Sequence, residues 1–474
     1  MAAPPGMNDQ FREDGLWWLP GGEDDKVAGE LTFNQEDGAV LKLLGSFEGK
    51  PFRPFQSDLK DHPVILGALK DGKAVTLLDS LNTGRHGAFF GGFVRETHKP
   101  HLTAIGLHFD SEEEAIFTKG YVRFEDIEAW LGDRFFDLEF RDDHTSLDLH
   151  VNRRREAPLG SFEEGILTFG SSLYTDQSET DYTITAHSYV SIEPSEKRSL
   201  AWFFSAASKI QSLASLCTGR HLPLLSLTLD GPEKRVSPDR THPADVRVYA
   251  QMSHSESQKA RRHDVPLIRA HNLTAYNSNA FKVWFSSYDE IASALHLFFA
   301  VQGAKWMYIN VRFLLAIQAL EVFHRLTCDD TIMDEAEHQA LQIALLKAIP
   351  QGTPPRMRNK LEGTLQFSNE PSLMQRLKSI MTQVRAEFGE TPGGFSNSYL
   401  HALVTTRNYY THYSPGLEGK TLEGTDMHYA TRRIILLLTV LLLLRLGIGA
   451  EGVRGALTNH REFRTLWDKA GVPK

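Results

Sequence analysis

The stretch RRIILLLTVLLLLRLGIG, residues 432–449, decides the fold of the C-terminal part of this 474-residue chain. It holds eleven consecutive uncharged residues, 434–444, of which Thr439 alone is polar, between Arg433 and Arg445. A helix needs about 20 such residues to cross a bilayer. The stretch therefore predicts a helix that is buried within a bundle or packed against a second subunit, and no membrane partner.

Helical periodicity continues upstream of this stretch. The segments 287–303, 306–326, 371–389 and 396–415 all repeat apolar residues with helical spacing. One face of the second segment is made by Ile309, Phe313, Ile317, Leu320 and Phe323. Residues 281–474 are therefore predicted to form an all-α domain of at least five helices.

The preceding residues, 1–280, show a different pattern. Short apolar segments separated by Gly, Asp and Asn predict many strands, and KVAGELTFN (26–34) and AVLKLLGSF (39–47) flank QEDG as a hairpin. One longer helix is expected at 199–217. The predicted fold class is thus α+β multidomain: a mostly-β sandwich or barrel-like domain followed by an all-α helical bundle.

Charge is unevenly divided between the two parts. Residues 281–474 hold 21 Lys and Arg against 18 Asp and Glu, a net charge of +3, which leaves −12 for residues 1–280 of a chain whose total is −9. The C-terminal part can tolerate a polyanion, whereas the N-terminal part mostly repels one. Nucleic-acid binding is permitted by this balance without being indicated by it.

Cysteine usage and the start of the chain bear on location and cofactors. Two cysteines, Cys217 and Cys328, are too few for a disulfide framework or a four-Cys zinc site. MAAPPGMNDQFREDG lacks the basic and apolar regions of a signal peptide, so a cytoplasmic location is expected. The glycine-rich GAFFGGF (87–93) does not follow the strand-to-helix pattern of phosphate loops. No cofactor and no metal site is predicted.

RNYYTH, residues 407–412, is the one candidate for chemistry on a phosphate. Arg followed by His after four to six intervening residues recurs along the chain, but only at Arg407-Asn408-x3-His412 does Asn directly follow the Arg of such a pair. The helix that carries it has Ser396 or Asn397 as a possible N-cap and is expected to end just before Pro415.

The helical period separates the two candidate residues. Arg407 and His412 lie about 140° apart around the helix axis, so they do not stack directly. The guanidinium could curl toward the imidazole, or it could meet an imidazole from a second subunit. The plain structural alternative is a capped helix with a polar surface stripe made by His401, Thr405, Asn408 and His412.

The motif resembles the signature of HEPN ribonucleases: Arg, a polar residue, a few residues, then His, on a helix followed by a long hydrophobic helix. AIQALEVFHRL (316–326) is similar to the first long helix of ApeA-type HEPN domains. GLWWLPGGEDDKVAGELTFNQEDGAVLKLLGSF (15–47) and YVRFEDIEAWLG (121–132) resemble the ApeA N-terminal domain. The resemblance therefore spans both parts of the chain.

The resemblance implies a metal-independent endoribonuclease of abortive-infection defence against phage, with RNA as substrate. His412 would move protons, Arg407 would bind the scissile phosphate, and Asn408 would orient the imidazole or contact the phosphate. Sites of this family are typically built from two protomers, which implies a homo-oligomer, at least a dimer through the HEPN domain, with the apolar 434–444 stretch as interface material. A phage-derived trigger is expected to act at the N-terminal domain.

Three further residues stay open. Glu321 could pair with Arg407 or be a solvated carboxylate, and Tyr409 and Tyr410 could stack on bases or be buried aromatics. Two rival functions also stay open. The helical domain could be a non-catalytic dimerisation or binding module, or the N-terminal domain could supply the main function by binding a carbohydrate or another small ligand.

Overall fold

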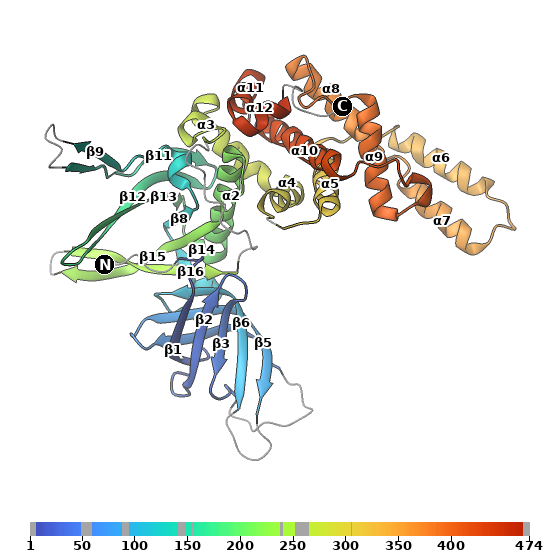
Figure 1. Ribbon diagram of the computed structural model, residues 1–474. Coiled ribbons are helices and arrows are strands. Elements are labelled where there is room, and N and C mark those ends of the chain that lie inside the picture. Colours follow the sequence, from blue (N-terminus) through green and yellow to red (C-terminus); the bar gives the residue numbers. More distant parts are fainter. Residues whose placement is uncertain are drawn as a thin grey trace. The chain divides into compact units, whose positions relative to one another are not determined.

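The computed structural model describes residues 6–48, 59–87, 94–140, 147–153, 155–237, 240–251, 265–304 and 306–467. The chain divides into two compact units, Met1–Ser286 and Ser287–Lys474. The first is built mainly of strands and the second of helices (Figure 1). The predicted fold class is therefore confirmed. The glycine-rich stretch 87–93 lies, after Gly87, outside the described residues.

The first six strands close into an antiparallel barrel, drawn in blue in Figure 1. Their order is β6-β3-β2-β1-β4-β5, and β5 pairs again with β6, so the ring is complete. Closure removes the free strand edges that a sandwich would leave. The predicted hairpin around QEDG is the β2–β3 pair, with Asn34 opposite Gly38. The strands are β1 (Phe11–Trp18), β2 (Val27–Asn34), β3 (Gly38–Leu43), β4 (His62–Leu69), β5 (Ala74–His86) and β6 (Arg95–Ile105).

Trp17 on β1 is packed into the core of this barrel. Its side chain has no exposed surface, and its ring lies against the backbone of two glycines. A Cβ placed on Gly67 of β4 would lie 2.2 Å from Trp17 Cε3, and one on Gly29 of β2 would lie 3.0 Å from Cδ1. Glycine at both positions makes the room that the indole needs.

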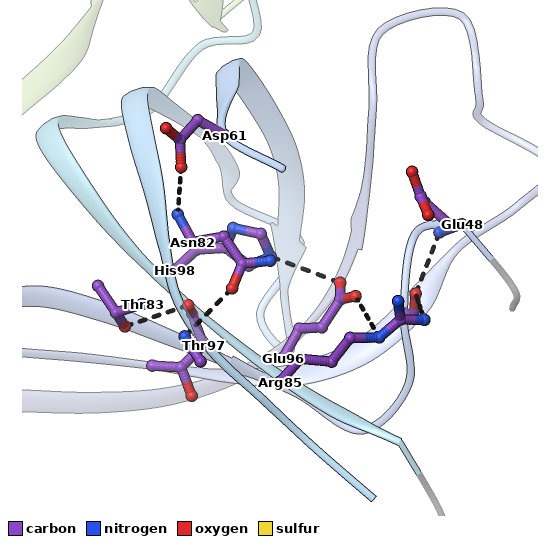
Figure 2. Close-up of polar contacts among 10 residues, drawn as sticks. Glu48, Asp61, Asn82, Thr83, Arg85, Glu96, Thr97 and His98 are labelled. Carbon is purple, nitrogen blue, oxygen red and sulfur yellow. Dashed lines mark hydrogen bonds and ion pairs between the residues drawn. The ribbon is translucent and has the colours of Figure 1, made fainter. Parts of the chain in front are cut away.

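A polar cluster joins β5 to β6 (Figure 2). Arg85 Nε lies 3.3 Å from Glu96 Oε1, His98 Nε2 lies 3.6 Å from Glu96 Oε2, and Arg85 Nη2 donates to Ser46 Oγ at 3.2 Å. Burial raises the pKa of Glu96, but the hydrogen bonds from His98 and Ser46 and the charges of His98 and Arg85 outweigh it and lower the pKa. The Glu96 carboxylate is therefore ionised at neutral pH, and it holds the two strands together from inside the protein.

Strand β6 also leads from the barrel into a second sheet. His98 of β6 lies opposite Leu41 of β3, whereas Ala104, further along, lies opposite Val248 of β16. From β16 the sheet continues through β15, β8, β13 and β12 to β11. The remaining strands of the first unit are β7 (Ile116–Phe117), β8 (Gly120–Phe124), β9 (Phe136–Phe140), β10 (Leu147–Val151), β11 (Ala157–Phe162), β12 (Gly165–Gln177), β13 (Tyr182–Pro194), β14 (Arg198–Ser199), β15 (Leu224–Ser237) and β16 (Arg240–Ala250).

Helix α2 (Leu200–Thr218), predicted at 199–217, covers one face of this second sheet. The Ser199 side chain accepts a hydrogen bond from the Trp202 N–H at 3.3 Å, and Gly219 ends the helix with a φ of 75°. A Cβ on Gly120 of β8 would lie 2.7 Å from Phe203 Cδ1, so α2 rests directly on β8. The shorter helices of the first unit are η1 (Glu112–Glu114), α1 (Ile127–Leu131) and α3 (Ala270–Tyr276).

The second unit contains only helices among its described elements. The five predicted helices are present as α4, α5, α8, α9 and α10, and α4 begins before the division at Ser286. The bounds are α4 (Ala280–Gly303), α5 (Ile309–Thr327), α6 (Glu335–Ala348), α7 (Pro355–Gln366), α8 (Leu373–Phe388), α9 (Asn397–His412), η2 (Pro415–Leu417), α10 (Gly424–Arg445), α11 (Ala450–Asn459) and α12 (Arg461–Trp467).

Helix α10 carries the apolar stretch 434–444. All of these residues are buried except Ile435 and Leu444, which are partly buried. The helix packs against α5, α11 and α12. In the described part of the chain it is the one helix long and apolar enough to cross a membrane, and 67% of its most apolar window is buried within the protein. The stretch is therefore core, and its expected use as interface material is wrong because the same unit already covers it.

The sequence did not single out α6 and α7. His338 is the one buried residue of α6, and α7 has none. An amphipathic pattern arises only where one face of a helix is buried. Helix α6 therefore leaves little periodicity to detect. Helix α7 does repeat Met357, Leu361 and Leu365 at helical spacing, but it contains too few apolar residues to stand out.

We predict opposite effects for two Gly-to-Ala changes. Gly67→Ala should destabilise the first unit by about 1–3 kcal/mol, because the added methyl group overlaps the Trp17 ring. Gly363→Ala in α7, where a Cβ would meet nothing within 4 Å, should stabilise its helix by about 0.5–1 kcal/mol. Denaturant unfolding followed by tryptophan fluorescence and by circular dichroism measures both. Equal stability of Gly67→Ala and wild type would contradict the packing described for Trp17.

Candidate functional site

Helix α9 places the candidate residues. Ser396 caps it by accepting a hydrogen bond from the Tyr399 N–H at 3.2 Å, which selects one of the two predicted caps. The helix ends at His412, Tyr413 follows with φ 49° and ψ 42°, and Ser414 is extended before Pro415. The left-handed Tyr413 turns the chain away directly after the histidine. The predicted helix end is confirmed.

Arg407 is held from two directions. Its Nη2 lies 3.4 Å from Glu321 Oε2 on α5, and its Nη1 donates to Asn408 Oδ1 at 3.3 Å. The Arg407 side chain is 32% exposed and that of Glu321 is 18% exposed. The pair is therefore partly desolvated, while one part of the guanidinium stays open to solvent. Glu321 is expected from the sequence either to pair with Arg407 or to be a solvated carboxylate, and in the structure it pairs with Arg407.

His412 is exposed at the end of α9. No hydrogen bond or ion pair links it to Arg407, Asn408 or Glu321 within the described part of the chain. The structure thus brings together Arg407, Asn408 and Glu321, and it places His412 about 140° around the helix axis from Arg407.

The tyrosines that follow Asn408 pack on one another. The ring centroids of Tyr409 and Tyr410 lie 5.1 Å apart, and those of Tyr409 and Tyr413 lie 5.6 Å apart. Tyr409 and Tyr410 are partly buried, and Tyr413 is 62% exposed. Burial and the charge of Glu423 raise the pKa of Tyr410, so its hydroxyl stays protonated at neutral pH. The three rings form a partly open aromatic surface beside the motif.

Thr406 fixes the chain that follows the site. Its hydroxyl donates to the Ala402 carbonyl at 2.7 Å and accepts from the Leu422 N–H at 2.9 Å, and the side chain is fully buried. The loop between α9 and α10 is thereby tied back to the helix one residue before Arg407. Sequence reasoning missed this residue, since a threonine on the apolar side of a helix gives no signal of a distant partner.

One other group in the helical unit brings together metal-ligating residue types: His324, Cys328 and Asp330. His324 Nδ1 lies 3.4 Å from Arg376 Nη1, and its Nε2 lies 3.4 Å from Asp330 Oδ2. Because a guanidinium only donates, Nδ1 accepts and the ring proton sits on Nε2. A metal at Nε2 would displace that proton and leave Nδ1 without one. The donor set therefore fits an ion-paired helix end better than a metal site.

Family comparisons match both units. The family described as ApeA N-terminal domain 1 matches residues 12–276, more than half of the chain, and the family described as Apea-like HEPN matches residues 314–451. The chain belongs to the ApeA family. No curated protein and no solved structure matches it.

The HEPN match contains all residues of the candidate site. Glu321 on α5 and the Arg407–His412 motif on α9 lie within residues 314–451. HEPN domains are generally ribonucleases, so membership of the ApeA family gives this protein a coarse assignment as a nuclease of the ApeA defence type.

We predict that Thr406→Val destabilises the helical unit by about 1–3 kcal/mol, because the part-buried N–H of Leu422 loses its acceptor. Thr411→Val is the matched control: Thr411 is exposed and its hydroxyl bonds only to the Arg407 carbonyl, at 2.7 Å, among the described residues. Thermal unfolding of the two variants measures the difference. Equal melting temperatures would show that the contact with Leu422 does not hold the loop.

Proposed function

We propose that this ApeA-family protein is a metal-independent endoribonuclease that acts in abortive-infection defence against phage. The observation that carries the proposal is the pair of groups on one helix: a guanidinium held by Glu321 yet still part exposed, and an exposed histidine five residues later. One group can stabilise negative charge and the other can move a proton.

The proposed chemistry uses the RNA's own nucleophile. The ribose 2′-oxygen attacks the adjacent phosphorus as its proton leaves, the bond to the 5′-oxygen breaks, and that oxygen takes up a proton. His412 serves as the base or the acid, because an imidazole can accept and give a proton near neutral pH. Arg407 stabilises the charge on the phosphorane with its planar fork, and Asn408 steers the fork through its side-chain oxygen. The products carry a 2′,3′-cyclic phosphate and a 5′-hydroxyl.

The separation of Arg407 from His412 favours a site shared between two protomers. A side chain five positions along a helix points about 140° away, so an Arg407 from one copy and a His412 from the other can face one phosphate. Exposed apolar residues around the start of α5 offer contact surface for a second copy. They include Trp306, which is 86% exposed, and Tyr308, which is 84% exposed. A homodimer, or a multiple of dimers, follows from the proposal.

Control is proposed to reside in the first unit. A cytoplasmic ribonuclease that was always active would kill its host, so a phage-derived trigger must release it. The net charge of −12 for residues 1–280 also disfavours this unit as an RNA surface and leaves it for sensing.

A second candidate function is a non-catalytic HEPN module. The ion pair between Arg407 and Glu321 supports it, because a partly buried pair between two helices is also what a purely structural motif would show. In that case the N-terminal unit would supply the function through a ligand.

We predict that wild-type protein purified from phage-infected cells cleaves RNA in the presence of EDTA, and that His412→Ala and Arg407→Ala lower the rate by roughly 10²- to 10⁴-fold. The measurement is the rate on a defined RNA, with the cut ends tested for 2′,3′-cyclic phosphate. A substrate with 2′-deoxyribose at the cut position should stay intact. His401→Ala is the matched control, because His401 is exposed on the same helix outside the motif. Cleavage by both motif variants at the wild-type rate would remove Arg407 and His412 from the proposed site.

A mixing experiment separates a shared site from one within a single protomer. When Arg407→Ala and His412→Ala subunits form a heterodimer, a shared arrangement pairs an intact Arg407 with an intact His412 at one of its two sites. We therefore predict that co-expressed variants regain about half the activity per heterodimer, although each homodimer is inactive. If the heterodimer stays inactive, the site lies within one protomer.

A further inference from the structure

A pocket of about 600 Å³ lies on the second sheet of the first unit. Gly120, Val122 and Phe124 of β8 face α2, and since side chains alternate along a strand, Tyr121 and Arg123 point to the other face. There they line the pocket together with residues of β12, β13, β15 and β16, and with the segment 6–9. Its volume is that of a site for a small organic molecule.

The carboxylates around the pocket already have donors of their own. Glu156 is paired with Lys119 at 2.9 Å, and Asp245 lies 4.0 Å from Arg247. Asp230 accepts from the Tyr121 hydroxyl at 3.1 Å, and Asp9 accepts from the Gly6 N–H at 2.7 Å. Their negative charge is therefore partly compensated before any ligand arrives.

Arg123 differs from them. Its Nε is buried, and its guanidinium has no hydrogen bond or ion pair with any residue in the described part of the chain. Burial lowers its pKa, and the charge of Glu128 opposes that effect without forming an ion pair. An arginine stays charged in a protein, and a buried charge without a counter-ion is costly. The guanidinium of Arg123 is thus left without a direct hydrogen-bond or ion-pair partner in the described part of the chain, although it lies in the lining of the pocket.

The neighbours of Arg123 on the sheet suit a bound anion. Ser226 of β15 lies opposite it in register, and the side chains of Ser226, Ser172 and His187 also line the pocket. Burial, aided by the charge of Arg123, lowers the pKa of His187 to about 4, so this ring is neutral at pH 7 and can donate or accept. Two hydroxyls, an imidazole and a guanidinium are groups that together bind a phosphate or a carboxylate.

Aromatic rings make the adjoining part of the wall. Tyr121 and Tyr189 meet edge to face with their centroids 5.4 Å apart, and Tyr174 lies against His187 with centroids 5.8 Å apart. The hydroxyls of Tyr121 and Tyr189 reach Asp230 and Glu156, so the rings are fixed in place. Fixed aromatic rings beside an anion site suit a ligand that carries a planar ring as well as a negative group.

We propose that this pocket binds a small anionic ligand with a planar ring, of the mononucleotide class, with the anionic group on Arg123 and the ring against Tyr121 and Tyr189. The binding reaction does not depend on the nuclease proposal, because its residues all belong to the first unit and the assay below measures no RNA cleavage.

The test is calorimetric titration of the full-length protein with 5′-AMP, 5′-GMP, 5′-CMP and 5′-UMP, and with inorganic phosphate and the four nucleosides as partial ligands. At least one mononucleotide should bind tenfold or more tightly than both its nucleoside and phosphate. Binding of none of the four would overturn the proposal. If phosphate binds as tightly as every nucleotide, the proposed contact of a planar ligand ring with Tyr121 and Tyr189 is wrong.

Arg123→Met should weaken mononucleotide binding by at least tenfold. The matched control is Arg12→Met on β1, whose side chain is 77% exposed and pairs with Glu30, and which should bind like wild type. Because nothing in the described part of the chain pairs with Arg123, Arg123→Met should also melt at the wild-type temperature or above it. A wild-type affinity in Arg123→Met would overturn the proposal, and so would a lowered melting temperature, since Arg123 would then be structural.

Tyr189→Leu provides a second, independent variant. It removes the ring and keeps Arg123, so nucleotide affinity should fall toward that of phosphate while phosphate binding is unchanged. An unchanged preference for nucleotide over phosphate would remove Tyr189 from the proposed site.

Discussion

The packing of α10 against α5 is the contact on which the helical unit depends. The stretch 434–444 presents apolar surface almost all round, and burying such surface is the main favourable term in folding. α5 contributes a buried face to the same core, which fixes its rotation about its own axis. Glu321 lies at the edge of that buried face, and from there its carboxylate reaches Arg407 on α9.

The Arg407–Glu321 pair therefore connects the edge of the α5–α10 core to a partly exposed guanidinium on α9. A partly exposed ion pair contributes little to stability on its own, so its main effect is to fix where the guanidinium points. Asn408, which is on the same helix as Arg407, restricts the direction of the guanidinium further by accepting a hydrogen bond from it. His412 is placed independently, by the helix end and the left-handed Tyr413 behind it. Two separately positioned groups on one helix suit a site that a second protomer completes.

In the first unit, one face of the second sheet packs against α2 and the other face lines the pocket. On β8 the alternating side chains put Val122 and Phe124 under α2 and put Tyr121 and Arg123 on the pocket side. The barrel formed by β1–β6 is joined to this sheet through β6, whose first half pairs with β3 and whose second half pairs with β16. A continuous strand shared in this way lets the barrel and the pocket-bearing sheet form one compact unit.

The sequence by itself determined the two-part fold, the helix that carries RNYYTH, the end of that helix before Pro415, and the family. Each of these rests on local information: the period of apolar residues, cap and proline chemistry, or a contiguous motif. Only the tertiary structure decided that the 434–444 stretch is core of its own unit, that Glu321 pairs with Arg407, and that Thr406 ties down the following loop. It alone also brought Arg123 into a pocket with residues of four other strands. These contacts join residues far apart in the chain, and their distances depend on how helices and strands pack, which no local pattern encodes.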